Sequence, residues 1–385
     1  MQGNKMLEEA VKQVANRVRG ALWGMYMGDA LAMPVHWYYD RNRLRRDFGQ
    51  ITKYEKSVPE FPGSIMNLSN TGGGGRGSDQ GSIIGDVILH GKKKYWTRGG
   101  SYHYHHGMEA GDNTLDTILA RLLVKTMADN KELITQEQRP TKLVDAYLEL
   151  YVKFMTTPDS HKDVYAATAH RMFFANWIKK LPLRECADND GHNTDSIDGM
   201  INVIPFTLVR VLAKPDADRN LWITDIINAL RNSDELPQWG RLYDEVLGRV
   251  LLGEKLRPAI EKVAAMISPQ LPRMLQKSVG TAADADPMTA CYIHSSFPAM
   301  LVFAYKYADN PKAALLASAN AGGENVNRSA ILGALMGAAH GPDFDLSLKQ
   351  GLVHAKEYET EIEQFVSTFS RGGPAAKTAQ ARSEL

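Results

Sequence analysis

The sequence predicts an all-α fold: a compact globule of many helices packed around a central one. Apolar residues recur at three- and four-residue spacing, the period of an amphipathic helix, in nine segments. Alternation of apolar and polar residues between turn signals, which is typical of strands, is scarce. The nine segments are Leu7–Leu31, Thr114–Met127, Leu143–Met155, Ile201–Leu212, Trp222–Leu230, Leu242–Leu252, Ala259–Ile267, Phe297–Tyr307 and Ala330–Ala339.

Composition excludes several classes of protein. The 385 residues are 44% apolar and 23% charged, as in a soluble globular protein. The net charge of +1 comes without a long basic stripe, so we expect no nucleic-acid partner. An uninterrupted apolar run of about eighteen residues is missing, so we expect no membrane span. The two cysteines, Cys186 and Cys291, make no disulfide framework, and with no secretory signal we expect a cytoplasmic protein.

The chain shows neither a fixed-period repeat nor a composition break. We therefore expect one domain over residues 1–370, followed by a disordered tail at 371–385 that lacks apolar residues. Three long polar or glycine-rich connections interrupt the helices, at Pro59–Gly81, Gly99–Gly111 and Asp188–Asp198. Connections of this length in a compact domain are usually functional or disordered.

Asp29 interrupts the apolar segment Gly20–Tyr39. An unpartnered buried carboxylate is costly, so Asp29 must be paired, act as a cap or belong to a site. A hydrogen bond to the next loop and a site role are equally compatible with the sequence.

A second polar cluster, Asp112, Asn113, Thr114 and Asp116, precedes an apolar helix. Carboxylate, amide and hydroxyl oxygens at a helix start can hold a hard cation such as Mg²⁺. The same residue types also cap the exposed amides of a first turn, which is the commoner explanation.

In a third segment, Ala319–Gly341, a Gly-Gly turn leads into Glu324, Asn325, Asn327 and Arg328. Glycines let the backbone approach a ligand closely, and amides at a helix start favour an anion. Ordinary loop-to-helix chemistry explains the same residues.

Two further segments give weaker signals. His103, His105 and His106 have loop spacing rather than the i, i+4 spacing of a helical metal pair, which favours an exposed or core role. Gly191–Gly199 concentrates polar residues, including Asp195, before an apolar helix. This segment is either a substrate-binding loop or a capped one.

Taken together and in order, the first three segments resemble the ADP-ribosylglycohydrolase family. Gly20–His36 is similar to its glycine-rich first motif, Thr114-Leu115-Asp116-Thr117 to its T-D-D-T motif, and Ala319–Ala338 to its A-x-A-G-G-D-T-D-T motif and following helix. The resemblance implies an all-α hydrolase in which two Mg²⁺ ions assist cleavage of the bond between an ADP-ribosyl group and its acceptor. The stretch His36–Asp40 also resembles crystallin-type relatives of that family.

The chain departs from the family pattern at the metal-binding positions. Leu115 replaces an aspartate, Glu324 and Val326 stand where the last motif has two aspartates, Asn327 replaces a threonine, and His36 replaces a glutamate. Leucine and valine offer no lone pair to a cation. We therefore expect no two-metal centre and at most one weakly bound Mg²⁺. Its ligands would be Thr114, Asp116, Glu324 and Asn327.

Three functions follow from these residues. The first is a divergent hydrolase of a glycosidic or related bond in a small, polar, ADP-ribose-like substrate, with Asp116 or Glu324 as the base. His36 is either a further base near neutral pH or a packed side chain. Arg328 would hold an anionic group. The other expected substrate-binding residues are Asp29, Asp79, Asp112, Asn113, Asp195 and Asn325. The alternatives are a non-catalytic, crystallin-like binding or structural protein and an ordinary Mg²⁺-dependent hydrolase of ADP-ribosylated acceptors.

Overall fold

Helices make up the regular structure of the computed structural model, which describes residues 2–64, 66, 83–97, 99–135, 140–213 and 218–370. Extended chain pairs in these ranges only as isolated bridges, which confirms the all-α prediction. No helix in these ranges is long and apolar enough to cross a membrane. Asp79, the glycine-rich loop Gly72–Gly77 and the expected tail 371–385 lie outside the described residues.

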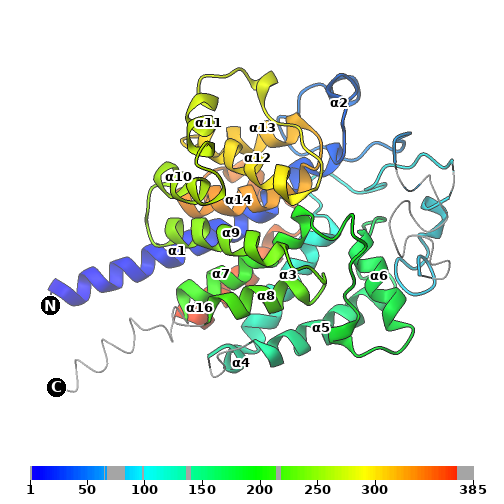
Figure 1. The fold of residues 1–385 in the computed structure, drawn as a ribbon, viewed down its shortest axis with the longest axis horizontal. Helices are drawn as coiled ribbons and strands as arrows, with labels where there is room; N and C mark the ends of the chain where they lie inside the picture. The colour runs from blue at the N-terminus through cyan, green and yellow to red at the C-terminus, as the bar shows by residue number, and fades with distance from the viewer. Residues whose placement is uncertain are drawn as a thin grey trace.

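Helices α1 (Gln2–Ala32) and α14 (Val326–His340) form the centre of the fold (Figure 1). They run antiparallel with their backbones in contact. A Cβ atom on Gly24 would lie 1.9 Å from the carbonyl oxygen of Gly333, and one on Gly20 would lie 2.0 Å from that of Gly337. Only glycine fits at such an approach, so the G-x-x-x-G spacing of α1 fixes how the two helices meet.

The other long helices pack on both sides of this pair (Figure 1). On one side lie α10 (Leu256–Ile267), α11 (Leu271–Ser278), α12 (Ile293–Lys306) and α13 (Pro311–Ala321). On the other lie α3 (Leu115–Asp129), α5 (Thr141–Thr156), α7 (Val203–Leu212), α8 (Arg219–Asn228) and α16 (Ala355–Ser370). Helix α9 (Leu236–Leu251) lies between the two groups and contacts α7 and α8 as well as α10 and α14. The remaining elements are α2 (Arg41–Phe48), α4 (Lys131–Thr135), α6 (Thr168–Trp177), α15 (Leu346–Gly351) and the 3-10 turns η1 (Met33–Val35), η3 (Lys93–Tyr95), η4 (Leu183–Glu185), η5 (Ile197–Met200) and η6 (Ala283–Ala285).

Each of the nine predicted segments overlaps an observed helix, while α2, α4, α6, α11, α13, α15 and α16 were not predicted. Helix α6 shows one reason. Every residue from Thr168 to Ala175 is buried, so this helix has no polar face to give its sequence a helical period.

The antiparallel arrangement brings the end of α1 to the start of α14. There the chain after η1 pairs with the Gly-Gly turn, because the amide of Trp37 donates to the carbonyl of Gly323 at 2.9 Å and the amide of Gly323 donates to the carbonyl of Tyr38 at 2.8 Å. This pairing sets His36 beside Glu324, although 287 residues separate them in the chain.

Replacing Gly24 by alanine should destabilise the fold, because its methyl group meets the rigid carbonyl of Gly333. Overpacking of this kind costs about 1–3 kcal/mol or more. We expect Gly24→Ala to lower the free energy of unfolding in urea by at least that amount. Gly280→Ala is the matched control, since a Cβ there meets nothing within 4 Å. Equal stability of the two variants would contradict the close backbone contact.

Candidate active site

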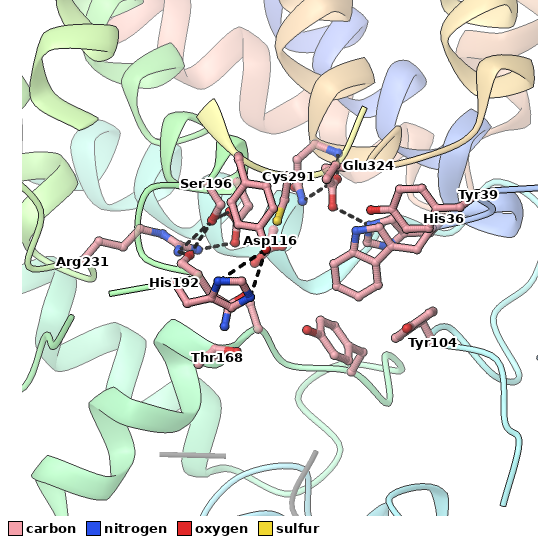
Figure 2. Close-up of a pocket in the computed structure, with 18 residues that line it drawn as sticks. His36, Tyr39, Tyr104, Asp116, Thr168, His192, Ser196, Arg231, Cys291 and Glu324 are labelled. Carbon is pink, nitrogen blue, oxygen red and sulfur yellow. Dashed lines mark hydrogen bonds and ion pairs between the residues drawn. The ribbon is translucent and has the colours of Figure 1, made fainter. Parts of the chain in front are cut away.

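A cavity of about 350 Å³ opens where α1 ends and α14 begins (Figure 2). Its volume lies within the range of small-molecule sites. Its polar wall is made of His36, Asp116, Thr168, His192, Asn193, Ser196, Asp198, Arg231, Cys291, Glu324 and Asn327. Its aromatic wall is made of Trp37, Tyr39, Tyr104, Tyr165 and Tyr292.

Glu324 enters this cavity from the Gly-Gly turn before α14. Gly322 and Gly323 both have positive φ, at 74° and 70°, a conformation that favours glycine. The Glu324 side chain is 1% exposed; Oε1 accepts from the backbone amide of Asn327 at 3.1 Å and from its Nδ2 at 3.2 Å. The other oxygen, Oε2, lies 2.9 Å from Nε2 of His36. The turn and the first residues of α14 thus fix the carboxylate in place.

His36 connects Glu324 to a deeper pair of residues. Its Nδ1 lies 2.7 Å from Nε2 of His105, and Nδ1 of His105 lies 2.9 Å from Oδ1 of Asp163. All of these side chains are buried. Trp37 stacks on His36 at 4.1 Å between ring centroids and has φ of 59°, a strained backbone conformation for a bulky residue.

The electrostatics of this cluster depend on which partner each group has. Burial raises the pKa of Asp163, but the charge and hydrogen bond of His105 and the amide of Leu115 lower it to about 2. Burial lowers the pKa of His105, but the charge and hydrogen bond of Asp163 outweigh burial and raise it. Burial, together with the charges of His105 and His36, holds the pKa of His103 well below its usual range. Neutral His103 is bonded by backbone groups, the carbonyl of Pro34 and the amide of His105.

Asp116 forms a second carboxylate–histidine unit at the cavity. It lies in the first turn of α3, and its Oδ1 is 3.0 Å from Nε2 of His170, whose Nδ1 is 2.8 Å from the hydroxyl of Tyr151. The Asp116 side chain is 19% exposed, which makes it the more accessible of the two carboxylates.

Arg231 provides a guanidinium at the cavity, and sequence reasoning did not find it. Its side chain is buried and contacts the carboxylate of Asp198 and, at 3.3 Å, the hydroxyl of Ser196 (Figure 2). Asp198 and Ser196 lie in the polar segment Gly191–Gly199, whereas Arg231 follows α8 without any motif around it.

Burial and the charge of Glu324 raise the pKa of Cys291 to about 12, so this thiol stays protonated near neutral pH.

The structure brings four of the predicted site residues together at this cavity, namely His36, Asp116, Glu324 and Asn327. Seven other predicted residues do not line it. These are Asp29, Asp112, Asn113, Thr114, Asp195, Asn325 and Arg328. Their expected roles in binding remain predictions that would require a rearrangement of this site.

The contacts of Asp29 are those of a residue that holds the next loop, which was the alternative to a role in the site. It is fully buried and accepts hydrogen bonds from Nδ2 of Asn113 at 2.7 Å and from the amide and hydroxyl of Thr114 at 2.8 and 2.6 Å. Because those donors are neutral, burial dominates and raises the pKa of Asp29.

Asp112 lies near Nζ of Lys162, at 3.2 Å, in the wall of a second cavity.

The expectation that Arg328 holds an anionic group does not fit its surroundings. Arg328 is fully buried, and its Nη2 donates to the carbonyls of Ser318 and Gly322 at 2.8 and 3.0 Å. Burial lowers the pKa of Arg328 to about 10. Asn325 likewise donates to two backbone carbonyls, and Asp195 accepts from the hydroxyl of Ser233. These side chains hold the loops that carry the site.

The donors at the cavity do not fit a two-magnesium centre. Thr114 is bonded to Asp29 rather than placed beside Asp116, and Leu115 supplies no oxygen ligand. Asp116 and Glu324 each already bind an imidazole. Within the described ranges, no three acidic, histidine or cysteine side chains form a group suited to a metal ion.

The described chain is thus an all-α protein with a polar cavity where α1 ends and α14 begins. A sequence model of the ADP-ribosylglycohydrolase family matches residues 10–376, and the chain belongs to this family. Membership supports a hydrolase-like function on a small-molecule substrate.

One solved structure, named "ADP-ribosylglycohydrolase-related protein complex", is similar in fold, with a TM-score of 0.54. The match covers 93% of this chain and 99% of that chain at 16% sequence identity, so the likeness concerns the fold alone. No curated protein matches the sequence.

Acid should remove the stabilisation that Asp163 provides. Its pKa in the folded state lies below the value of about 3.9 of an unfolded aspartate, so the contribution is present above pH 4 and is lost as the pH falls toward 2. The shift corresponds to about 2 kcal/mol. We expect the difference in unfolding free energy between wild type and Asp163→Asn to shrink by that amount between pH 5 and pH 2. Asp159→Asn, at an exposed position nearby, should change stability by less than about 0.5 kcal/mol at either pH.

A calorimetric titration with Mg²⁺ tests the expected metal content. We predict at most one weak site, which should disappear in Asp116→Asn and remain in Asp309→Asn, a change on the surface. Tight binding of two equivalents would contradict the interpretation that the missing carboxylates remove the two-metal centre.

Proposed function

We propose that this protein is a divergent hydrolase that cleaves a glycosidic or related bond of a small, polar, ribosylated substrate. The observation that carries the proposal is the oriented carboxylate of Glu324 in the wall of a cavity of small-molecule size, with Asp116 in the same wall. Buried, hydrogen-bonded carboxylates in a cavity are typical of general bases.

Glu324 is suited to orient a water molecule. An ionised carboxylate has about four acceptor positions, and the amide and side chain of Asn327 and the ring of His36 occupy three of them. The remaining position can accept a hydrogen bond from water. The carboxamide oxygen of Asn327, which is buried and has no hydrogen-bond partner, offers a further acceptor in the same wall.

In the proposed reaction, Glu324 takes a proton from water while the water oxygen bonds to the anomeric carbon of the sugar. The bond to the leaving group breaks with its electron pair, and a proton from the site or from solvent completes the leaving group. The carboxylate of Asp116 stabilises the positive charge that develops on the sugar ring, as the second carboxylate does in glycosidases.

The walls of the cavity favour a substrate that combines a ring with polar groups. Trp37, Tyr104 and Tyr165 meet edge to face, with centroids 4.5 to 5.4 Å apart, and present apolar surface beside the carboxylates. In the described part of the wall, the guanidinium of Arg231 is already paired with Asp198. An ADP-ribose-like substrate would therefore place its ribose here and its diphosphate farther out.

A crystallin-like binding or structural protein is the second candidate. Leu115 and Val326 favour it, because they remove carboxylates that the family resemblance places at the metals. Ordinary Mg²⁺-dependent hydrolysis has less support, since Thr114 and Leu115 provide no ligand at the cavity.

Turnover of ADP-ribosylated arginine and serine peptides and of simple nucleosides, followed by chromatography of the released base or sugar, tests the proposal. We expect Glu324→Gln to lower kcat/KM by about 100-fold or more, because the amide cannot accept the proton. Glu363→Gln, which alters a surface pair with Arg19, is the matched control. Full activity of Glu324→Gln would refute the role of Glu324, and binding without turnover by the wild type would favour the crystallin-like alternative.

A further inference from the structure

Four buried side chains form a continuous hydrogen-bonded row that ends at the cavity. From the inside outward they are Asp163, His105, His36 and Glu324, joined at 2.9, 2.7 and 2.9 Å. The rings of His36 and His105 are nearly parallel, at 7°, with centroids 5.0 Å apart, which fits an in-plane N–H···N bond between them.

We propose that His105 and Asp163 are positioning residues of this site. Through two successive hydrogen bonds they fix the ring orientation and the ring protons of His36, which in turn holds the carboxylate of Glu324 toward the cavity. This inference rests on the proposed function, which assigns Glu324 the role of base.

At the inner end of the row, the direction of the hydrogen bond between His105 and Asp163 is defined. Asp163 accepts hydrogen bonds from the backbone amides of Leu115 at 2.9 Å and Tyr165 at 3.2 Å, in addition to the ring of His105. Three donors converge on one carboxyl group, so it must be an ionised acceptor. The proton of the first link therefore belongs to Nδ1 of His105.

The three links of the row require three protons. The first lies on Nδ1 of His105, which donates to Asp163. The second lies between Nε2 of His105 and Nδ1 of His36, and the third between Nε2 of His36 and Glu324. Asp163 sustains this arrangement from a position that does not line the cavity of the site.

His103 shows the contrast with an ordinary core histidine. Both of its ring nitrogens are bonded to backbone groups. These bonds satisfy the hydrogen-bonding groups of the ring and connect it to no other side chain. The ring nitrogens of His105 are bonded to side chains on both sides, one of which leads to Glu324. Backbone partners like those of His103 would be enough to pack a buried histidine. The side-chain partners of His105 therefore indicate that it orients His36.

Nitrogen NMR of protein labelled with ¹⁵N-histidine tests the proposal without any substrate. In the wild type we expect a ring N–H signal from Nδ1 of His105 and a scalar coupling between Nδ1 of His36 and Nε2 of His105. Asp163→Asn should lose the coupling, because an amide cannot accept from all three donors and the ring of His105 is then no longer held in line with that of His36. His106→Gln alters a neighbouring histidine outside the row and should leave both features unchanged.

Absence of the coupling in the wild type, or its persistence in a folded Asp163→Asn variant, would overturn the proposal. If Asp163→Asn does not fold, His105→Gln decides: His36 should then show a mixture of ring tautomers, and retention of the Nε2–H form alone would also overturn it. Since no turnover is measured, a failure here is distinct from a failure of the proposed hydrolysis.

Discussion

The backbone contact between α1 and α14 is the constraint on which the site depends. No side chain separates Gly24 from Gly333, so neither helix can slide or rotate without a clash of carbonyl groups. The same contact fixes where α1 ends relative to where α14 begins. His36, which follows α1 and η1, and Glu324, which precedes α14, meet for that reason, and the cavity opens beside them.

Two buried carboxylates fix the start of α3, one from α1 and one from the connection before α6. Asp29 holds Thr114, and Asp163 holds the amide of Leu115, so both fix the start of the helix that carries Asp116. Their pKa values move in opposite directions from a similar degree of burial. Asp29 has only neutral donors and its pKa is raised, whereas Asp163 faces His105 and its pKa is lowered to about 2. The partner, rather than the burial, decides which carboxylate stays ionised.

The sequence could predict what depends on local pattern. Helical period located nine helices, and motif spacing located His36, Asp116, Glu324 and Asn327 at the cavity. It could not predict contacts that only the folded chain creates, such as that of His105 with Asp163, which are 58 residues apart and belong to no periodic pattern. Arg328 follows a glycine-rich turn and looked like an anion ligand in the sequence. Its burial against backbone carbonyls follows from the packing of α13 and α14, which no local pattern reports.

The row of histidines bears on the metal site that the family resemblance implies. A carboxylate as buried as Glu324 is costly without hydrogen-bond donors or a cation. The resemblance implies that further carboxylates hold metal ions beside such a residue, and it places Leu115 and Val326 at two of those positions. In this structure the backbone amide and side chain of Asn327 contact one oxygen of Glu324, His36 lies 2.9 Å from the other, and His105 in turn supports His36. A cation at Glu324 would have to compete with these contacts for the same oxygens. The contacts of Glu324 therefore favour the proposed site, which depends on hydrogen bonds, over the ordinary two-metal one.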